Sequence, residues 1–305
     1  MLSKIKILSL AYLFILLASC QVTPEISIHS EATETSSPEP LLTATLALTS
    51  TPVAETVVFE ENKSPNGEWI GKVTVTTQGI NKNVKFSLVN NITGQNWLIE
   101  NRDFLEPENP LEGFEYPYIF KWSEDGQHLF YSHLSTGGDG CYVTHKPGGF
   151  DFHRFDLATG EDIILQATGG TQLALSPDEK KLAYVQNWDS QLTILDFENK
   201  NMQVIPLLTI TEVQGLVDTI DHILWSPDRT HLVYSYSWGD CGDYFVSNII
   251  ILELDTLSQI FLVENNRNGY IPIEWAKKEQ ILIKDNEDNQ WWLNVTTKEI
   301  IPVNK

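Results

Sequence analysis

Ser226-Pro227-Asp228-Arg229-Thr230 and Ser176-Pro177-Asp178-Glu179-Lys180 are two copies of the tight turn that decides the fold of this chain. Similar five-residue stretches begin at Ser64 and Ser123, and a degenerate one begins at Ala276. Each follows a strand-like run of residues, and an apolar, aromatic run resumes at once. Proline presets φ at the second turn position, and Asp or Asn bonds the backbone two residues on. Each stretch therefore favours a tight reversal between two strands.

The spacing of these turns predicts the architecture. Their second residues are 65, 124, 177, 227 and 277, so the steps are 59, 53, 50 and 50 residues. A second turn recurs in each unit, beginning at Asn90, Asp156, Asp196, Glu253 and Asn294. Every unit therefore reads as four strands joined by a turn, a loop and a turn, which is the order of one propeller blade. We predict an all-β fold, a β-propeller with five four-stranded blades.

Other architectures stay open. The first unit has no Trp before its turn and the fifth has lost Ser-Pro-Asp, so six blades, or an incomplete ring completed by a partner, are alternatives. A two-sheet sandwich is a further alternative, but twenty short strands would make it unusually large.

Two repeat units carry a family resemblance. They read WSPDRTHLVYSYS at 225–237, followed by ILELDTLSQ, and LSPDEKKLAYVQ at 175–186, followed by LTILDFENK. These units resemble the TolB-type propeller repeat, a bacterial relative of the WD repeat, and the resemblance covers roughly residues 57–305. It implies the propeller fold. It implies no single function, because TolB-type blades occur in translocation partners, peptidase propeller domains and sugar-processing lyases alike.

Aromatic residues recur at fixed positions of the repeat. Regular positions favour a role in the core between blades over a role as stacking platforms for sugars. We predict core positions for Trp69, Tyr131, Tyr184 and Tyr234 in the second strands, and for Trp122, Trp225 and Trp275 at the ends of the first strands.

The amino terminus predicts an extracytoplasmic address. A short basic segment, residues 1–6, precedes an apolar stretch, residues 7–17, and Cys20 follows directly after Leu-Ala-Ser. This is the arrangement of a secretory signal. Its end resembles a lipobox, which implies that residues 1–19 are removed and that Cys20 is lipidated at a bacterial cell membrane or outer membrane. An uncleaved anchor helix is the alternative, although the apolar run is shorter than the roughly 20 residues that span a bilayer.

Residues 20–56 predict a tether. They are rich in Ser, Thr, Pro and Glu and contain no Trp, Tyr, Phe or Gly, so they bury too little apolar surface to offset the entropy of ordering. The apolar run 41–48 is an exception that suits an open sheet edge. We therefore expect a signal peptide at 1–19, a lipidated and disordered tether at 20–56, and a propeller domain at 57–305.

The charge of the chain limits its partners. It has 20 basic and 41 acidic residues, and removal of Lys4 and Lys6 with the signal leaves a net charge of −23. Such a surface repels nucleic acid and anionic lipid head groups. We expect no nucleic-acid partner, and we expect the acyl chain on Cys20 to make the membrane contact.

Two further cysteines favour a disulfide. Cys141 and Cys241 lie in similar loops of the second and fourth units, on the same face of a propeller, and cysteines outside the cytoplasm oxidise. Two unpaired thiols are the alternative. A metal site built from Cys141 with His133, His145 and His153 is disfavoured, because these spacings match no common zinc pattern. We expect these histidines to be surface or strand residues.

Length variation points to a binding face. The two turn types stay short in every unit, whereas the other two connections vary, and both variable connections lie on one face. Oxygen ligands in loops suit Ca²⁺, and carboxylates beside aromatic rings suit cationic, protein or glycan ligands. Solvated loops whose Asp and Asn serve turn geometry are the alternative. The residues predicted on this face are Asp139, Tyr142, Trp188, Asp189, Trp238, Asp240, Asp243, Asp285 and Asp288.

No motif identifies an active site. A glycosidase on a five-bladed propeller needs two carboxylates on innermost strands. The candidates are Glu60, Glu115, Asp218, Asp221 and Glu274, which do not repeat at one position. The sequence contains no Gly-rich phosphate loop, His-Glu zinc helix or calcium-hand motif. We predict a non-catalytic binding or assembly module without a cofactor, with a Ca²⁺ site and a surface glycan-active enzyme as alternatives.

Overall fold

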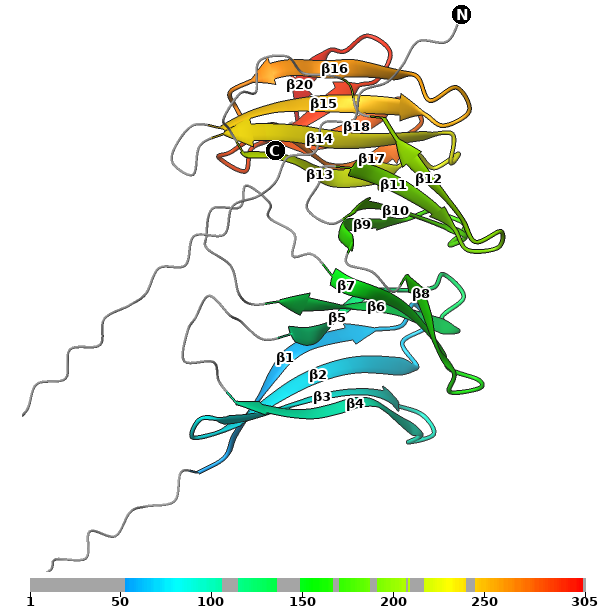
Figure 1. Ribbon diagram of the computed structural model, residues 1–305, viewed down its shortest axis with the longest axis vertical. Coiled ribbons are helices and arrows are strands. Elements are labelled where there is room, and N and C mark those ends of the chain that lie inside the picture. Colours follow the sequence, from blue (N-terminus) through cyan, green and yellow to red (C-terminus); the bar gives the residue numbers. More distant parts are fainter. Residues whose placement is uncertain are drawn as a thin grey trace, which may run out of the picture. The chain divides into compact units, whose positions relative to one another are not determined.

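The structure is a computed structural model that describes residues 53–105, 115–135, 149–166, 170–186, 191–206, 208, 217–239 and 245–303. These residues belong to one compact unit, Thr51–Lys305, and they form twenty strands in antiparallel pairs (Figure 1). This part of the chain has no helix with the length and apolarity that a membrane crossing requires.

The strands form five sets of four, which we call blades 1 to 5, with strands a to d paired in chain order. Blade 1 comprises β1 (Glu55–Lys63), β2 (Trp69–Gln78), β3 (Asn81–Asn90) and β4 (Asn96–Leu105). Blade 2 comprises β5 (Glu115–Trp122), β6 (His128–Ser135), β7 (Gly149–Asp156) and β8 (Asp162–Gln166). Blade 3 comprises β9 (Gly170–Leu175), β10 (Lys181–Gln186), β11 (Gln191–Asp196) and β12 (Asn201–Ile205). Blade 4 comprises β13 (Val217–Trp225), β14 (His231–Gly239), β15 (Phe245–Glu253) and β16 (Gln259–Asn266), and blade 5 comprises β17 (Ile271–Lys277), β18 (Gln280–Lys284), β19 (Gln290–Asn294) and β20 (Ile300–Pro302).

These blades confirm the predicted all-β fold. Each is a four-stranded antiparallel meander, and a single backbone pairing, Gly149 with Gly170, connects blade 2 to blade 3. The first strand begins at Glu55, two residues before the predicted start of the domain. The fold is therefore a propeller type with five blades.

The first turns are built around one serine each. In blades 1 to 4 its hydroxyl is buried and donates to the Asn or Asp side chain two residues on, at 2.6–2.7 Å. The same oxygen accepts a hydrogen bond from the backbone N–H five residues on, at 2.9–3.0 Å. Blade 5 lacks this serine, and its turn shortens to residues 278–279. The repeated serine thus explains why four turns share one geometry.

Apolar clusters fill the space between consecutive blades. One cluster joins blades 1 and 2, another joins blades 2 and 3, and two more join blades 3 and 4 and blades 4 and 5. The predicted aromatic positions of the second strands are all buried, with Tyr184 and Tyr234 fully enclosed. The prediction that these side chains form the inter-blade core is confirmed for Trp69, Tyr131, Tyr184, Tyr234, Trp122 and Trp225.

The two ends of the blades differ. Connections from strand a to b and from c to d lie at one end, the short-turn end, and each contains five residues or fewer. Connections from b to c and from d to the next a lie at the other end, the loop end, because antiparallel strands alternate in direction. They range from two residues, at 79–80, to thirteen, at 136–148. The prediction that long and variable connections lie at one end of the blades is confirmed.

Candidate functional site

Most residues predicted for the loop end lie outside the described part of the chain. These residues are Asp139, Tyr142, Trp188, Asp189, Asp240 and Asp243. The lipidation site Cys20 and the predicted disulfide Cys141–Cys241 also lie outside it. These assignments stay predictions.

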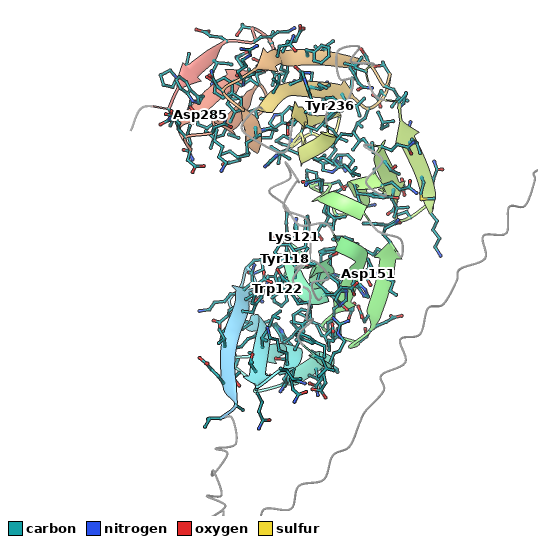
Figure 2. The ribbon with its side chains drawn as sticks, turned by 60° about the vertical axis from the view of Figure 1, so that its left-hand side comes forward. Tyr118, Lys121, Trp122, Asp151, Tyr236 and Asp285 are labelled. Carbon is teal, nitrogen blue, oxygen red and sulfur yellow. The ribbon has the colours of Figure 1, made fainter. Side chains whose placement is uncertain are left out.

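Trp238 is one of three predicted ligand-face residues that the structure describes. It lies on β14 with 6% of its surface exposed and belongs to the apolar cluster between blades 3 and 4. Its ring centroid is 6.0 Å from that of Tyr236, which is labelled in Figure 2. The side chain therefore serves the core and presents little surface to a ligand.

Asp285, labelled in Figure 2, and Asp288 lie in the turn between β18 and β19. Oδ1 of Asp285 accepts hydrogen bonds from the N–H groups of Glu287 and Asn289, both at 2.9 Å. Asp288 has a φ of 60° and receives a hydrogen bond of 2.7 Å from Lys284 Nζ. Both carboxylates thus have structural roles within their own turn, as the turn-geometry alternative predicts.

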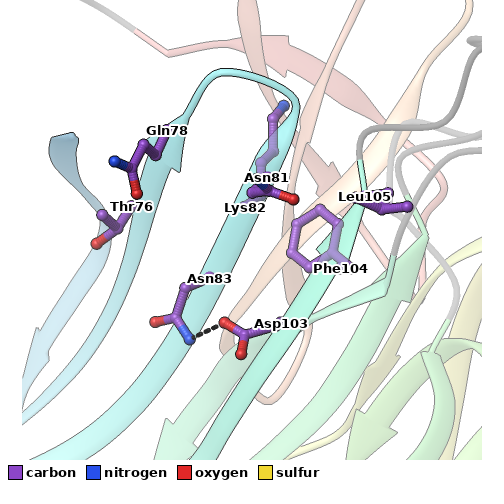
Figure 3. A pocket seen from close by; sticks show the side chains of 8 residues that line it. All are labelled: Thr76, Gln78, Asn81, Lys82, Asn83, Asp103, Phe104 and Leu105. Atoms are coloured by element: carbon purple, nitrogen blue, oxygen red, sulfur yellow. Dashed lines mark hydrogen bonds between the residues drawn. The ribbon is translucent and has the colours of Figure 1, made fainter. Parts of the chain in front are cut away.

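An open pocket of about 440 Å³ lies at the loop end of blade 1 (Figure 3). The hairpin between β2 and β3 and the end of β4 form its walls. Asn83 Nδ2 donates to Asp103 Oδ1 at 2.8 Å within it, beside the ring of Phe104. A pocket of this size with polar groups and an aromatic ring suits a small polar ligand or one side chain of a protein partner.

Glu60 on β1 is the candidate carboxylate with the best-defined surroundings. Its Oε2 accepts a hydrogen bond of 3.0 Å from the backbone N–H of Ile119 in blade 2. Burial raises the pKa of Glu60, although this hydrogen bond opposes the rise. Burial also raises the pKa of Tyr116 and of Tyr118, and the Glu60 charge adds to both effects. Through its hydrogen bond with Ile119, Glu60 links β1, strand a of blade 1, to β5, strand a of blade 2.

A cluster of histidines and carboxylates interrupts the apolar contact between blades 1 and 2. His133 lies on β6, and His153 lies on the neighbouring strand β7. Asp151, labelled in Figure 2, also lies on β7. Tyr131 and Phe155, two residues away along these strands, belong to the core cluster shared with blade 1. Alternate residues of a strand face the same side, so the two histidines also face blade 1.

Four close contacts join five side chains of this cluster into one row. His133 Nε2 is 2.8 Å from Glu100 Oε2 of β4, and His133 Nδ1 is 2.7 Å from Asp151 Oδ1. His153 Nε2 is 3.1 Å from Asp151 Oδ2, and His153 Nδ1 is 3.2 Å from Asp162 Oδ1. We call these five residues the His–carboxylate cluster. Blade 1 supplies Glu100, and blade 2 supplies the other four.

Carboxylates and histidines alternate along the cluster, and this order determines the pKa values of its members. Burial lowers the pKa of both imidazoles, but the carboxylates on each side of the rings outweigh it, so the pKa of His133 and that of His153 rise to about 9. Burial disfavours the charged form of Asp151, yet the two histidines hold its pKa well below its usual range. The hydrogen bond from His133 is the main cause of the lowered pKa of Glu100.

One buried atom of the cluster has no hydrogen bond. His153 is 7% exposed, and its Nε2 atom lies near Asp151 Oδ2 at an angle outside hydrogen-bond geometry, with no other partner among the described residues. The ring stacks on Tyr131 with centroids 4.5 Å apart and planes at 22°. Stacking fixes the ring, so this nitrogen stays directed toward Asp151 and His133.

The sequence prediction missed this cluster. It considered His133 and His153 only with Cys141 and His145, because sequence spacing was the criterion, and expected surface or strand residues. Both are strand residues, and His153 is buried. The available signal was Asp151-Phe152-His153, which places two polar side chains on one strand face opposite His133.

Comparison with known proteins concerns the fold. No protein-family model and no curated protein matches the chain. A protein described as a dipeptidyl aminopeptidase IV from Bacteroides ovatus has a TM-score of 0.52 and 10% identity, with 80% of this chain and 39% of that chain covered. TolB from Acinetobacter baumannii has a TM-score of 0.39 and 12% identity, with 82% of this chain and 55% of that chain covered. The periplasmic gluconolactonase of Pseudomonas aeruginosa has a TM-score of 0.45 and 12% identity, with 80% of this chain and 68% of that chain covered.

The chain spans between 37% and 64% of the length of the first four solved structures that it matches. At these identities the likeness concerns the fold alone. The repeat sequence and the five blades identify that fold as a TolB-like β-propeller.

Proposed function

We propose that this chain is a lipid-anchored, extracytoplasmic β-propeller that acts as a non-catalytic binding or assembly module. The difference between the two ends of the blades carries the proposal. Connections of two to thirteen residues gather at the loop end, while the short-turn end stays uniform. In repeat architectures, length variation on one face marks the face that contacts a partner, because the strands that hold the core stay unchanged.

The partner we propose is a protein or a glycan bound at the loop end. The open pocket of blade 1 lies at this end and offers Asn83 and Asp103 beside Phe104. A net charge of −23 after loss of the signal favours cationic or neutral surfaces and disfavours nucleic acid. The acyl chain on Cys20 would hold the protein at the membrane, and residues 20–56 would give the propeller reach toward its partner.

A matched pair of isoleucines tests the binding end. Ile80, in the hairpin between β2 and β3, is 67% exposed at the loop end, and Ile92, in the turn between β3 and β4, is 73% exposed at the short-turn end. A photo-crosslinking amino acid is placed at one or the other position in the full chain, in its native cells. We expect covalent adducts of defined mass from position 80 and none from position 92. Equal adducts from both positions, or adducts from position 92 alone, would contradict the proposal.

Substitution of the lipidation site tests the anchor. We expect Cys20→Ala to abolish incorporation of labelled palmitate and to release the protein from membranes, because one side chain carries the proposed acyl group. A variant that still fractionates with membranes in high salt would show that the attachment has another source.

A glycan-active enzyme is the alternative that Glu60 favours, because a carboxyl group with a raised pKa suits a general acid. Glu60→Gln keeps an oxygen that accepts from Ile119 N–H and removes the acid. The binding proposal predicts that wild type and variant give the same result, no release of reducing sugar from envelope glycans. If the wild type released reducing sugar and the variant did not, the protein would be a glycan-active enzyme instead.

A further inference from the structure

The arrangement of donor atoms in the His–carboxylate cluster points to a metal site. We propose that His133, Asp151 and His153 bind one divalent transition-metal ion at the interface of blades 1 and 2. One donor atom from each of these three residues lies within 4.8 Å of the others. Tetrahedral zinc ligands at about 2.0–2.1 Å from the metal lie roughly 3.4 Å apart, so shifts of an ångström or less bring the three atoms around an ion.

The Nε2 atom of His153, whose polar contact among the described residues is the 3.1 Å ion pair with Asp151 Oδ2, is the second observation that indicates a ligand. Nε2 is buried, lacks a hydrogen bond, and is fixed by the stacking of its ring on Tyr131. Buried polar atoms in folded proteins have partners, and each exception calls for an explanation. A metal ion bound between Asp151 and this nitrogen would replace their 3.1 Å contact with two ligand bonds, and His133 Nδ1, on the other side of the same carboxylate, would be its counterpart.

The outer contacts of the two rings match a second coordination shell. Glu100 bonds the ring nitrogen of His133 that faces away from Asp151, and Asp162 does the same for His153. A histidine that binds a metal typically bonds a carboxylate through its other nitrogen, which fixes its tautomer and orientation. Tyr131 OH donates to Asp162 Oδ2 at 2.7 Å and so steadies this shell in turn.

The charge of the surroundings favours a cation. Glu100, Asp151 and Asp162 contribute three negative charges. Arg102, whose Nε is 3.1 Å from Glu100 Oε1, contributes one positive charge and is also paired with Glu115 at 3.9 Å. Beside the apolar cluster of blades 1 and 2, an unbalanced charge would be costly.

The donor set selects the class of ion. Two imidazole nitrogens and one carboxylate oxygen suit Zn²⁺ and related first-row ions, with a fourth position open to water or to a ligand. Ca²⁺ and Mg²⁺ prefer shells made of oxygen atoms. This site therefore differs in kind from the calcium site considered for the loop end.

Zinc titration of the full chain tests the proposal. The protein carries no histidine tag, is stripped with a chelator, and has its thiols alkylated so that cysteine cannot bind the metal. We expect isothermal titration to show one Zn²⁺ per chain and an increase in melting temperature of several degrees. Excess Ca²⁺ or Mg²⁺ should leave the Zn²⁺ bound. Absence of this single site in the wild-type protein would overturn the proposal.

Variants separate the cluster from adventitious binding. Glu100→Gln, in the outer shell, should weaken the affinity by about 10–100-fold, and Asp151→Asn and His153→Gln by more. The matched control is His128→Gln, on the same strand β6, whose ring lies 3.3 Å from Asp156 of β7 outside the cluster. It should bind as the wild type does. Equal affinity in wild type and Asp151→Asn would contradict the proposal.

A spectroscopic measurement keeps the proposal testable if the variants fail to fold. X-ray absorption of the Zn²⁺-loaded wild-type protein should show two imidazoles and otherwise oxygen in the first shell. A shell containing sulfur, or oxygen atoms alone, would overturn the assignment of His133 and His153 as ligands.

Discussion

One side-chain oxygen of Asn or Asp organises the first turn in blades 1 to 4. In blade 4, Asp228 Oδ1 accepts from Ser226 Oγ at 2.7 Å and from the N–H of Thr230 at 3.2 Å. In blade 1, Asn66 Oδ1 makes the equivalent bonds with Ser64 Oγ at 2.7 Å and with the N–H of Glu68 at 3.1 Å, without a charge. The turn geometry therefore needs the oxygen and does not need the carboxylate charge.

A pH experiment on Asp228 separates the contribution of the side-chain oxygen from that of the carboxylate charge. Hydrogen bonds from Thr230 and Ser226 lower its pKa to about 2, below the roughly 3.9 of an unfolded Asp. Its contribution to stability is therefore present above about pH 4 and is lost as the pH falls through about 2. We expect Asp228→Asn to keep most of the stability at pH 7 and to lose less on acidification. Asp228→Ala should cost about 0.5–1 kcal/mol at pH 7.

Melting temperatures of the three proteins between pH 7 and pH 2 provide the measurement. If Asp228→Asn were as destabilised as Asp228→Ala at pH 7, the charge and not the oxygen would hold the turn.

Gly94 and Gly160 lie at equivalent positions of two second turns. Substitution of each by alanine separates the cost of backbone strain from the cost of a steric clash. Gly94 and Gly160 have φ of 74° and 73°. A Cβ at Gly94 would meet nothing within 4 Å, whereas a Cβ at Gly160 would lie 2.7 Å from Cζ3 of Trp97 in blade 1. Gly94→Ala should cost about 1–2 kcal/mol for the left-handed backbone alone. Gly160→Ala should cost a further 1–3 kcal/mol or so, because the Trp97 ring packs in the core cluster and on Phe155.

Urea unfolding of both alanine variants gives the two costs. Equal costs would mean that Trp97 moves aside freely, and the close approach of blade 1 to this turn would then have no structural role.

At the scale of the element, strand a of blades 2, 4 and 5 carries a tryptophan near its end. Trp225, at the end of β13, is 7% exposed, and its Nε1 donates to the carbonyl oxygen of Ala174 in blade 3 at 2.8 Å. Trp275 has the same position in blade 5, but its Nε1 donates within its own turn, to Lys278 O at 3.4 Å. Blades 3 and 4 are therefore joined by a buried polar contact as well as by apolar packing.

We expect replacement of tryptophan by phenylalanine to destabilise the protein more at position 225 than at position 275. Trp225→Phe removes the hydrogen bond to the carbonyl oxygen of Ala174, which should cost about 0.5–1.5 kcal/mol beyond the loss of ring contacts. Trp275→Phe loses a longer and more exposed hydrogen bond and should cost clearly less. Chemical denaturation of both variants measures the difference. A cost for Trp275→Phe equal to that of Trp225→Phe would show that the bond to Ala174 contributes nothing.

The elements differ in how far the sequence could predict them. Ser176 and Ser226 lie in turns whose chemistry is local, so the spacing of five-residue stretches predicted the strands on either side. The contact of Glu100 with His133 depends on two strands from different blades, and the repeat carries no information on such pairs. For the same reason Trp238 was assigned to a loop face, whereas its strand continues into the core through residue 238.

At the scale of the whole molecule, the two cysteines of the loop end bear on stability. Cys141 and Cys241 lie in the connections 136–148 and 240–244, both at this end. A bond between them would close a loop of about 100 residues and add roughly 4–5 kcal/mol in the chain-entropy model. We expect non-reducing mass spectrometry to find them linked and reduction to lower the melting temperature by several degrees. Recovery of both as free thiols from protein folded in an oxidising compartment would refute the bond.

The central claim is that the blades hold the fold while the loop end binds the partner. The most direct test replaces the two longest connections, 136–148 and 206–216, with the five-residue connection 285–289, in a chain that carries the crosslinking residue at position 80. A matched control exchanges the short-turn connection 157–161 for 91–95, which is also five residues long. We predict that both proteins keep the β-sheet circular dichroism spectrum of the parent and that only the first loses its crosslinked adducts. Unchanged adducts in a folded protein without its long connections would contradict the claim.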